Sequence, residues 1–255
     1  MSGSDSAKEF FSKHAEGYAK SESHARGSDL ALLIELAKPA KSDVVLDVAT
    51  GTGFTAIEFA PLVKEVVAAD ITEEMLQEAR KLASERGIKN IRFESADACR
   101  KLPFADSSFD IVSCRRAAHH FTDVPLFLSE ARRVLRKDGC LCIVDMSPQE
   151  GGQEFANKIE QLRDSTHVRA HTANEWRQEL ADAGFLVRNL ELLPDRVSLE
   201  KWLYPVPLGG REEKEVRTAW RKAPKEMIDL FEVNKDARGE IRDWIKTRVI
   251  LVAVK

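Results

Sequence analysis

Three aspartates in the first hundred residues each follow a short apolar segment, and together they could bind a nucleotide-like cofactor. Asp47 precedes a loop that contains Gly51 and Gly53. Asp70 lies 19 positions beyond Gly51, and Asp97 follows a third apolar segment. A carboxylate at a strand end can accept hydrogen bonds from ribose hydroxyls, and glycines let a ligand approach the main chain. Each aspartate alone reads as a turn residue, but the set predicts a cofactor site.

The charge of the glycine loop favours one cofactor class over another. The pattern Gly51-x-Gly53-x-x-Ala56 also satisfies the dinucleotide fingerprint, so NAD is an alternative. A pyrophosphate needs hydrogen-bond donors, whereas Asp47 would place a negative charge beside it. An acidic loop without phosphate suits a cofactor that carries an ammonium and a sulfonium group. We therefore predict S-adenosylmethionine.

Alternating apolar and amphipathic segments predict the elements that position these residues. Helical patterns separate the short apolar runs, as in a doubly wound α/β fold with a mostly parallel sheet. The predicted strands are 44–48, 65–69, 91–94, 109–114 and 140–144. The predicted helices of this half are 5–18, 27–38, 54–62, 73–86 and 125–135, with a turn at 137–139.

The pattern changes after Met146, and the chain there predicts a covering segment. Helices are expected at 153–163 and 173–183, and strands at 185–193 and 247–254. About fifty residues separate these two strands, too many for a hairpin, so we expect helices over the sheet edge. The expected organisation is an N-terminal helical cap (1–38), a cofactor-binding core (39–146) and a C-terminal half (147–255). A lid insertion at about 195–244 completes this single domain.

Composition excludes several classes of protein. The 255 residues are 43% hydrophobic and 32% charged, with a net charge of −3. General binding to nucleic acid or to anionic membranes normally needs a basic face, so neither is expected. No segment approaches the roughly 18 apolar residues of a spanning helix, and no signal peptide is evident, so we expect a cytoplasmic protein without stable membrane insertion. The four cysteines lack CxxC spacing, and we predict no metal site.

Four stretches together resemble the class I S-adenosylmethionine-dependent methyltransferases, and within them the small-molecule branch that includes the ubiquinone/menaquinone C-methyltransferases. The resemblance covers about residues 40–146, and it departs from the common pattern at Ala49, where many members have glycine. The matching stretches are VLDVATGTG, VVAADITEEML, ESADACRKLPFADSSFDIVSCRRAAHHF and EARRVLRKDGCLCIVD.

The resemblance implies a Rossmann-like seven-stranded sheet whose last strand is antiparallel, and it implies roles for individual residues. The Asp47–Gly53 loop, including Ala49 and Gly51, would hold the methionine portion of the cofactor. The other implied contacts are Asp70 for the ribose, Ile71 for an adenine face, Asp97 and Ala98 for the adenine edge, and Arg115 beside the methyl-transfer site, with Tyr18 and His24 folding over the cofactor.

Histidines supply the candidates for proton transfer. His119 and His120 directly follow the fourth predicted strand, and imidazole accepts protons near neutral pH. Adjacent side chains usually point apart, so we expect at most one of them to act as general base or substrate contact; the alternative is an imidazole packed against the backbone. His167, Arg169 and His171 form a second group of candidate substrate contacts, with a solvated polar loop as the alternative.

The sequence therefore predicts an S-adenosylmethionine-dependent methyltransferase that moves a methyl group onto a small organic metabolite by in-line displacement. O-, N- and C-methylation all remain open. The alternatives are an NAD-dependent oxidoreductase and a cofactor-binding regulatory protein without methyl-transfer activity.

Overall fold

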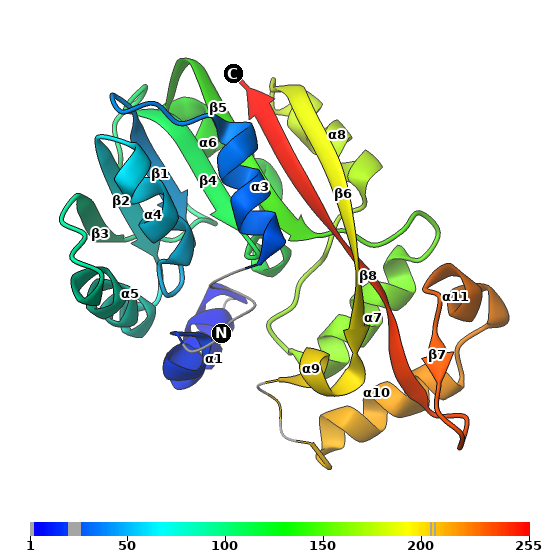
Figure 1. Cartoon of the computed structure of the whole chain (residues 1–255). Helices are drawn as coiled ribbons and strands as arrows, with labels where there is room; N and C mark the ends of the chain where they lie inside the picture. Colours follow the sequence, from blue (N-terminus) through cyan, green and yellow to red (C-terminus); the bar gives the residue numbers. More distant parts are fainter. Residues whose placement is uncertain (1–2, 20–26, 205, 207) are drawn as a thin grey trace.

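A computed structural model describes residues 3–19, 27–204, 206 and 208–255, and one mixed sheet runs through it (Figure 1). The strand order is β3-β2-β1-β4-β5-β8-β6, with β7 paired to β8. The strands are β1 (Val44–Val48), β2 (Glu65–Asp70), β3 (Ile91–Ser95), β4 (Phe109–Arg115), β5 (Leu135–Met146), β6 (Leu186–Ser198), β7 (Asn234–Lys235) and β8 (Ile241–Val254).

The sheet reverses its winding between β1 and β4, and this reversal defines where a ligand is expected. β1 pairs in parallel with β2 on one side and with β4 on the other. β5 continues the parallel part, and β8 lies antiparallel between β5 and β6. The prediction of a mostly parallel sheet with an antiparallel last strand is confirmed. Open α/β sheets bind ligands beyond the carboxyl ends of their strands at such a reversal.

Helices cover both faces of the sheet, with α3 and α4 on one face and α6 and α8 on the other (Figure 1). A 3₁₀ turn at Ala60–Leu62 directly follows α4, and another at Ala118–His120 lies between β4 and α6. The helices are α1 (Gly3–Ala19), α3 (Ser28–Ala37), α4 (Phe54–Phe59), α5 (Glu73–Glu85), α6 (Val124–Val134), α7 (Gln153–Arg163), α8 (Ala173–Asp182), α9 (Leu199–Leu203), α10 (Arg211–Arg221) and α11 (Lys225–Leu230).

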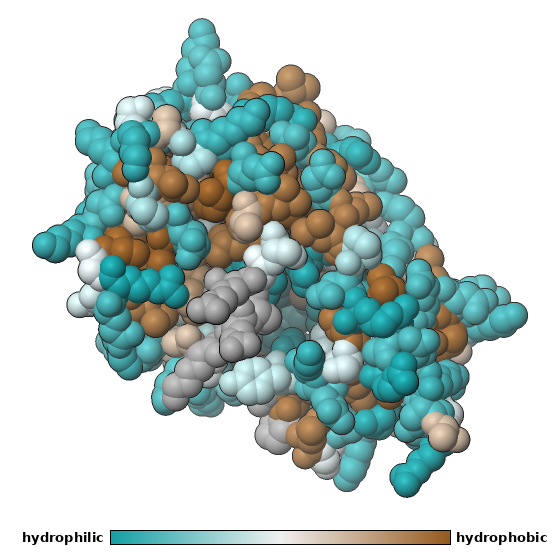
Figure 2. Space-filling model, in the orientation of Figure 1, coloured by the Kyte–Doolittle hydropathy of each residue, from teal (hydrophilic) through white to brown (hydrophobic). Residues whose placement is uncertain are grey.

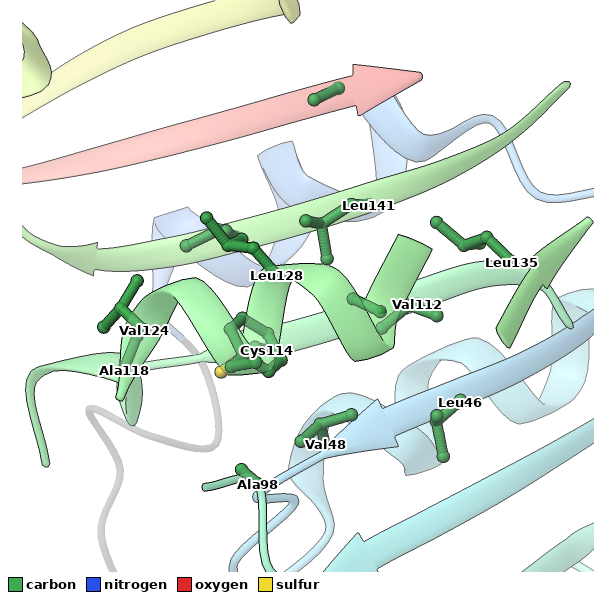
Figure 3. Close-up of a cluster of buried hydrophobic side chains, with 14 of the residues drawn as sticks. Leu46, Val48, Ala98, Val112, Cys114, Ala118, Val124, Leu128, Leu135 and Leu141 are labelled. Carbon is green, nitrogen blue, oxygen red and sulfur yellow. The ribbon is translucent and has the colours of Figure 1, made fainter. Parts of the chain in front are cut away.

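Burial on both faces explains why the central strands are continuous apolar runs. In β1, Val45 joins the core under α3 and α4, whereas Leu46 and Val48 join the core under α6. In Figure 3, Leu128 of α6 lies close to Leu141 of β5, within that second core. Packing from two sides fixes the carboxyl ends of the strands, where the candidate site residues lie.

The fifth strand begins earlier than the sequence predicted. The predicted turn at 137–139 lies within β5, because the pairing with β4 jumps from Phe109–Leu135 to Ile111–Cys140. The extra residues form an irregularity in which Asp138 adopts a φ of 65°. A bulge lets the segments on both sides of it stay hydrogen-bonded to β4. The polar residues at 137–139 therefore do not end the strand.

Strands β6 and β8 are also longer than predicted, and together they form an extended ribbon. β6 and β8 pair from Leu186–Val254 to Ser198–Asp243, so the expected all-helical insertion begins and ends as strand. Arg196 Nη1 contacts Asp243 Oδ1 at 2.8 Å across this ribbon. Such polar cross-strand pairs stabilise a ribbon that lacks the apolar pattern of a buried strand.

The lid has an apolar core of its own, separate from the two cores of the sheet. We use "lid" for α7 together with α9, α10, α11 and β7, which gather at one end of the molecule (Figure 1). Their core contains Trp202 and Trp220, and Trp244 of β8 packs into it. At the other side, α1 packs against α5, and Ser12 Oγ donates to Glu74 Oε2 at 2.8 Å. The carboxyl edge of the sheet therefore has a helix on one side and the lid on the other.

Candidate active site

The loop after β1 takes a shape that needs small residues. Ala49, Gly51 and Gly53 all have positive φ, at 53°, 55° and 81°. A Cβ on Gly53 would lie 2.8 Å from the Cβ of Ala79 in α5, so this glycine also permits close helix packing. No atom lies within 4 Å of the position that a Cβ on Gly51 would take, and this part of the loop lines a cavity.

Asp47 supports this loop from behind. Its carboxylate accepts hydrogen bonds from Thr50 Oγ1 at 2.5 Å and from Ser113 Oγ at 2.6 Å. Burial raises the pKa of Asp47 to about 6, although both hydroxyl hydrogen bonds oppose that rise. Neither Asp47 nor Gly53 lines the cavity that Gly51 lines, so their placement suits a role in shaping the loop.

Asp70 links the glycine loop to the end of β2. Its Oδ2 accepts from Gly51 N at 2.8 Å, and its Oδ1 accepts from Thr72 N at 2.9 Å. Burial raises the pKa of Asp70, and these backbone hydrogen bonds oppose the rise. The carboxylate thus has a fixed position at the wall of a cavity.

The first cavity gathers most of the residues that the sequence assigned to the cofactor. Its wall also includes the buried side chain of Phe54 and the Phe11 ring of α1. His24 lies outside the described residues. The predicted residues on this wall are Tyr18, Ala49, Gly51, Asp70, Ile71, Asp97, Ala98, Arg115 and His120.

The polar and apolar groups of this cavity fit S-adenosylmethionine. Asp70 and Asp97 offer carboxylates from neighbouring strands, and Ile71 and Met75 offer apolar contacts. Thr72 Oγ1 is buried at the same wall and has no hydrogen-bond partner among the residues described. Acceptors for hydroxyl and amine groups beside apolar surface suit a nucleoside that carries a positively charged tail.

A second cavity adjoins the first and has a volume of about 450 Å³. The two share four lining residues, namely Phe11 and Tyr18 of α1, Arg116 after β4, and His120. The second cavity extends to the lid, and Figure 2 shows a recess between the core and the lid. Its size is within the usual range for small-molecule sites, which is roughly 300–1,000 Å³.

His119 faces the second cavity and is oriented by Asp145 at the end of β5. His119 N donates to Asp145 Oδ2 at 2.8 Å, and its Nδ1 lies 2.5 Å from Asp145 Oδ1. Burial by itself raises the pKa of Asp145, but the His119 imidazole and its hydrogen bonds lower that pKa overall. The ionised carboxylate favours a proton on Nδ1, which leaves Nε2 as a proton acceptor.

His120 lies where the two cavities meet. Its Nδ1 lies 3.1 Å from Thr166 O, and its ring meets the Phe11 ring edge-on at 5.0 Å between centroids. Burial and the neighbouring His119 lower the pKa of His120 to about 3. His120 is therefore neutral near pH 7 and is a poorer base than an unperturbed histidine.

The second predicted group, at 167–171, lines neither cavity. His167 is buried beside His119, and its Nε2 lies 2.7 Å from Asn157 Oδ1. Arg169 is exposed and pairs with Glu175. His171 packs against Trp176 with 5.0 Å between ring centroids. Only Arg169 lies in a solvated loop, as the alternative for this group predicted, whereas His167 and His171 are buried outside both cavities.

Two consecutive arginines at the carboxyl end of β4 share one buried carboxylate from α3. Asp29 contacts Arg115 Nε at 3.1 Å and Arg116 Nε at 2.8 Å. Burial alone raises the pKa of Asp29, but Arg116 and Arg115 lower it to about 2. This ion-pair cluster fixes both guanidinium groups at the cavity walls.

Sequence reasoning missed several residues of these two cavities and their supports, and four of them show why. Asp145 ends a strand just as Asp70 does, and this shared position could have revealed it. Asp29, Arg116 and Phe11 come from segments distant in sequence, and only the fold brings them to the site. Among the described residues, no group of three or more His, Cys, Asp or Glu side chains is placed to hold a metal ion.

Comparisons with known proteins agree with this geometry. Residues 39–184 match the family model described as a methyltransferase domain. The chain is 34% identical over 247 residues to YcgJ, an uncharacterised methyltransferase of Bacillus subtilis strain 168, covering 96% of this chain and 97% of YcgJ. It is also 32% identical to the ubiquinone/menaquinone biosynthesis C-methyltransferase of Teredinibacter turnerae, covering 66% of this chain and 67% of that enzyme.

Solved structures give the same result. The crystal structure of B. subtilis YcgJ superposes with a TM-score of 0.84 at 32% identity, covering 89% of this chain and 97% of that one. A candidate methyltransferase of Bacillus halodurans C-125 gives a TM-score of 0.85 at 36% identity, covering 90% and 99%. The chain therefore belongs to the methyltransferase-domain family and is an S-adenosylmethionine-dependent methyltransferase related to the ubiquinone/menaquinone C-methyltransferases.

Proposed function

We propose that the protein transfers the methyl group to a small organic metabolite that binds in the second cavity. The observation that carries this proposal is the contact between the two cavities at Phe11, Tyr18, Arg116 and His120. A cofactor in the first cavity and an acceptor in the second would meet at these four residues. The predicted helical cap (1–38) and the lid insertion at about 195–244 would enclose the acceptor.

The work of the protein in this reaction is alignment and exclusion of water. When bound, S-adenosylmethionine supplies a methyl group on a positively charged sulfur. The Gly51 loop and Asp70 would hold the cofactor in the first cavity, and Phe11 and Tyr18 would shield the junction from solvent. Fixed alignment of donor and acceptor favours an in-line displacement.

His119 would serve as general base if the acceptor must lose a proton. It faces the acceptor cavity, and Asp145 holds its Nδ1, so Nε2 points its lone pair away from the carboxylate. Asp145 acts through His119 and is a positioning residue. His120 has a lowered pKa, so we assign it a contact with the acceptor at the junction.

We also propose that the enzyme works in the cytoplasm. No helix of the described chain is long and apolar enough to cross a membrane. All four cysteines are free thiols, and three of them are buried, as is usual for proteins of reducing compartments.

A methyl-transfer assay tests the proposal. The purified protein is incubated with methyl-labelled S-adenosylmethionine and a panel of small acceptors with hydroxyl, amine and activated-carbon nucleophiles. We expect labelled product with at least one class. Cofactor binding without transfer to any acceptor would instead favour a regulatory protein that only binds the cofactor.

A further inference from the structure

The second cavity concentrates positive charge, although the whole chain carries a net charge of −3. Three aspartates contribute to its wall, namely Asp145, Asp164 and Asp195. Twice as many cationic side chains line the same wall. They are Arg116, Arg163, Arg196, Lys201, Lys246 and Arg248. The acceptor cavity therefore has the opposite sign to the protein as a whole.

Some of these cations are neutralised by nearby carboxylates, and others are not. Lys246 contacts Glu160 at 2.5 Å, and Arg196 contacts Asp243 at 2.8 Å. In contrast, the part of the chain that the structure describes holds no ion pair for Arg163 or Lys201. The positive charge that remains lies on the lid side of the cavity, where α7 ends and α9 begins.

The direct contacts of Arg163 are with neutral groups, although its charge helps to lower the pKa of the nearby carboxyls of Glu160 and Asp164. Its Nη2 donates to Tyr204 O at 2.8 Å, and its guanidinium lies 5.3 Å from the ring centroid of Trp202. Its Nε is buried and lacks a hydrogen-bond partner among the described residues. Arg248 Nε is also buried without a hydrogen-bond partner, and the one ion pair that Arg248 makes with another described residue is a 3.4 Å contact with the half-exposed Asp195.

Buried guanidinium donors without acceptors favour a ligand that brings oxygen acceptors with negative charge. We infer that the methyl acceptor carries an anionic oxygen group, a carboxylate or a phosphate, that binds to Arg163, Lys201 and Arg248. This inference rests on the proposed function. The nucleophilic end of the acceptor would then lie at the opposite end of the cavity, near His119 and His120.

Matched pairs of probes test the inference by calorimetry on protein saturated with S-adenosylhomocysteine. One pair is 4-hydroxybenzoate and its methyl ester, and the other is phenyl phosphate and phenol. We expect the charged member of at least one pair to bind at least ten-fold more tightly than its neutral partner. The pair with the larger ratio identifies the anionic group as a carboxylate or a phosphate.

Three variants locate the effect. Lys201→Met changes an exposed side chain, so folding should be retained, and Arg163→Met keeps an aliphatic chain over Trp202. Both should reduce the charged-to-neutral ratio to less than three-fold. Lys158→Met is the matched control, because Lys158 is an exposed lysine of the lid that lines neither cavity, and it should keep the full ratio.

Two results would overturn the inference. The first is equal binding, or no measurable binding, of the charged and neutral probes by the wild-type protein. The second is a ratio that stays unchanged in both Lys201→Met and Arg163→Met. A parallel methyl-transfer assay distinguishes these failures from a failure of the proposed function, which would leave no labelled product with any acceptor even where S-adenosylhomocysteine binds.

Discussion

Aspartates at the same edge of the sheet have different tasks, because their neighbours differ. Asp47 is buried behind the glycine loop and binds two hydroxyls, whereas Asp70 binds two backbone N–H groups at a cavity wall. Asp145, two strands away from Asp47, orients His119. The environment of each carboxylate, more than its position after a strand, determines its chemistry.

Replacing the proposed base tests its role directly. His119→Ala should lower kcat for a proton-bearing acceptor by about 10²- to 10⁴-fold, the usual contribution of a general base. Affinity for S-adenosylhomocysteine should stay within two-fold, because His119 lines only the second cavity. The measurement is methyl transfer from labelled cofactor.

His171→Ala is the matched control for that variant. His171 is also a buried histidine, but it lines neither cavity and should leave kcat unchanged. A His119→Ala enzyme with wild-type kcat would remove His119 from the mechanism.

A buried neutral histidine also predicts how stability depends on pH. Burial, aided by His119, lowers the pKa of His167 to about 4, whereas the unfolded chain has the ordinary value of 6.5. Between these values the unfolded state binds a proton that the folded state does not, so stability falls as pH decreases from 6.5 toward 4. We expect this group to contribute about 3 kcal/mol of that loss.

Urea denaturation at pH 7 and pH 4 measures this effect. His167→Gln lacks the titrating group but can still donate to Asn157. Between pH 7 and pH 4, the free energy of unfolding should therefore fall further for the wild type than for the variant. The difference between the two losses should equal the predicted contribution of His167. Equal losses in the two proteins would show that His167 does not titrate in this way.

Most of the residues that the sequence assigned to the cofactor line the first cavity, because their motif is local in sequence. The loop at 47–53, Asp70 and Asp97 are each fixed by the end of one strand. Asp29 and Phe11 could not be predicted, since they come from helices whose contacts depend on the whole fold.

The helix α3 illustrates how one element is fastened to the sheet edge. Its only fully buried carboxylate, Asp29, sits between Arg115 and Arg116 at the carboxyl end of β4, while Leu33 anchors the helix in the core. Removal of one partner from a buried ion pair leaves uncompensated charge. The ion pairs therefore join α3 to the walls of the two cavities.

Asp29→Ala should thus reduce the free energy of unfolding by about 3–5 kcal/mol. Glu35→Ala on the same helix is the control, because Glu35 is exposed and its loss should cost less than about 0.5 kcal/mol. Chemical denaturation measures both. A similar small loss for the two variants would contradict a stabilising role for the Asp29 cluster.

Element boundaries show where sequence patterns are informative and where they are not. The central strands were predictable because both of their faces are buried. The outer parts of β6 and β8 were not, because that ribbon extends beyond the sheet and pairs polar residues such as Arg196 and Asp243. The length of these outer parts is set by backbone pairing between the two strands, and their sequences show little of the regular apolar alternation that would predict it.

At the scale of the whole molecule, we propose that the sheet provides a general cofactor site and that the lid provides a particular acceptor site. The sheet edge carries the family motifs, whereas the lid has its own core and supplies cations to the second cavity. Folds of this kind host many chemistries through variation of such covering segments. The acceptor is therefore encoded in parts of the chain that carry no family motif.

The central claim is that the cofactor binds in the first cavity against Asp70. Calorimetric titration with S-adenosylhomocysteine measures this most directly, using the wild type, Asp70→Asn and the control Asp110→Asn. Asp110 lies near the start of β4, at the opposite edge of the sheet, where it accepts from Val44 N. We predict at least a ten-fold loss of affinity for Asp70→Asn alone, with both variants folded by circular dichroism. Wild-type affinity in Asp70→Asn, or an equal loss in Asp110→Asn, would contradict the claim.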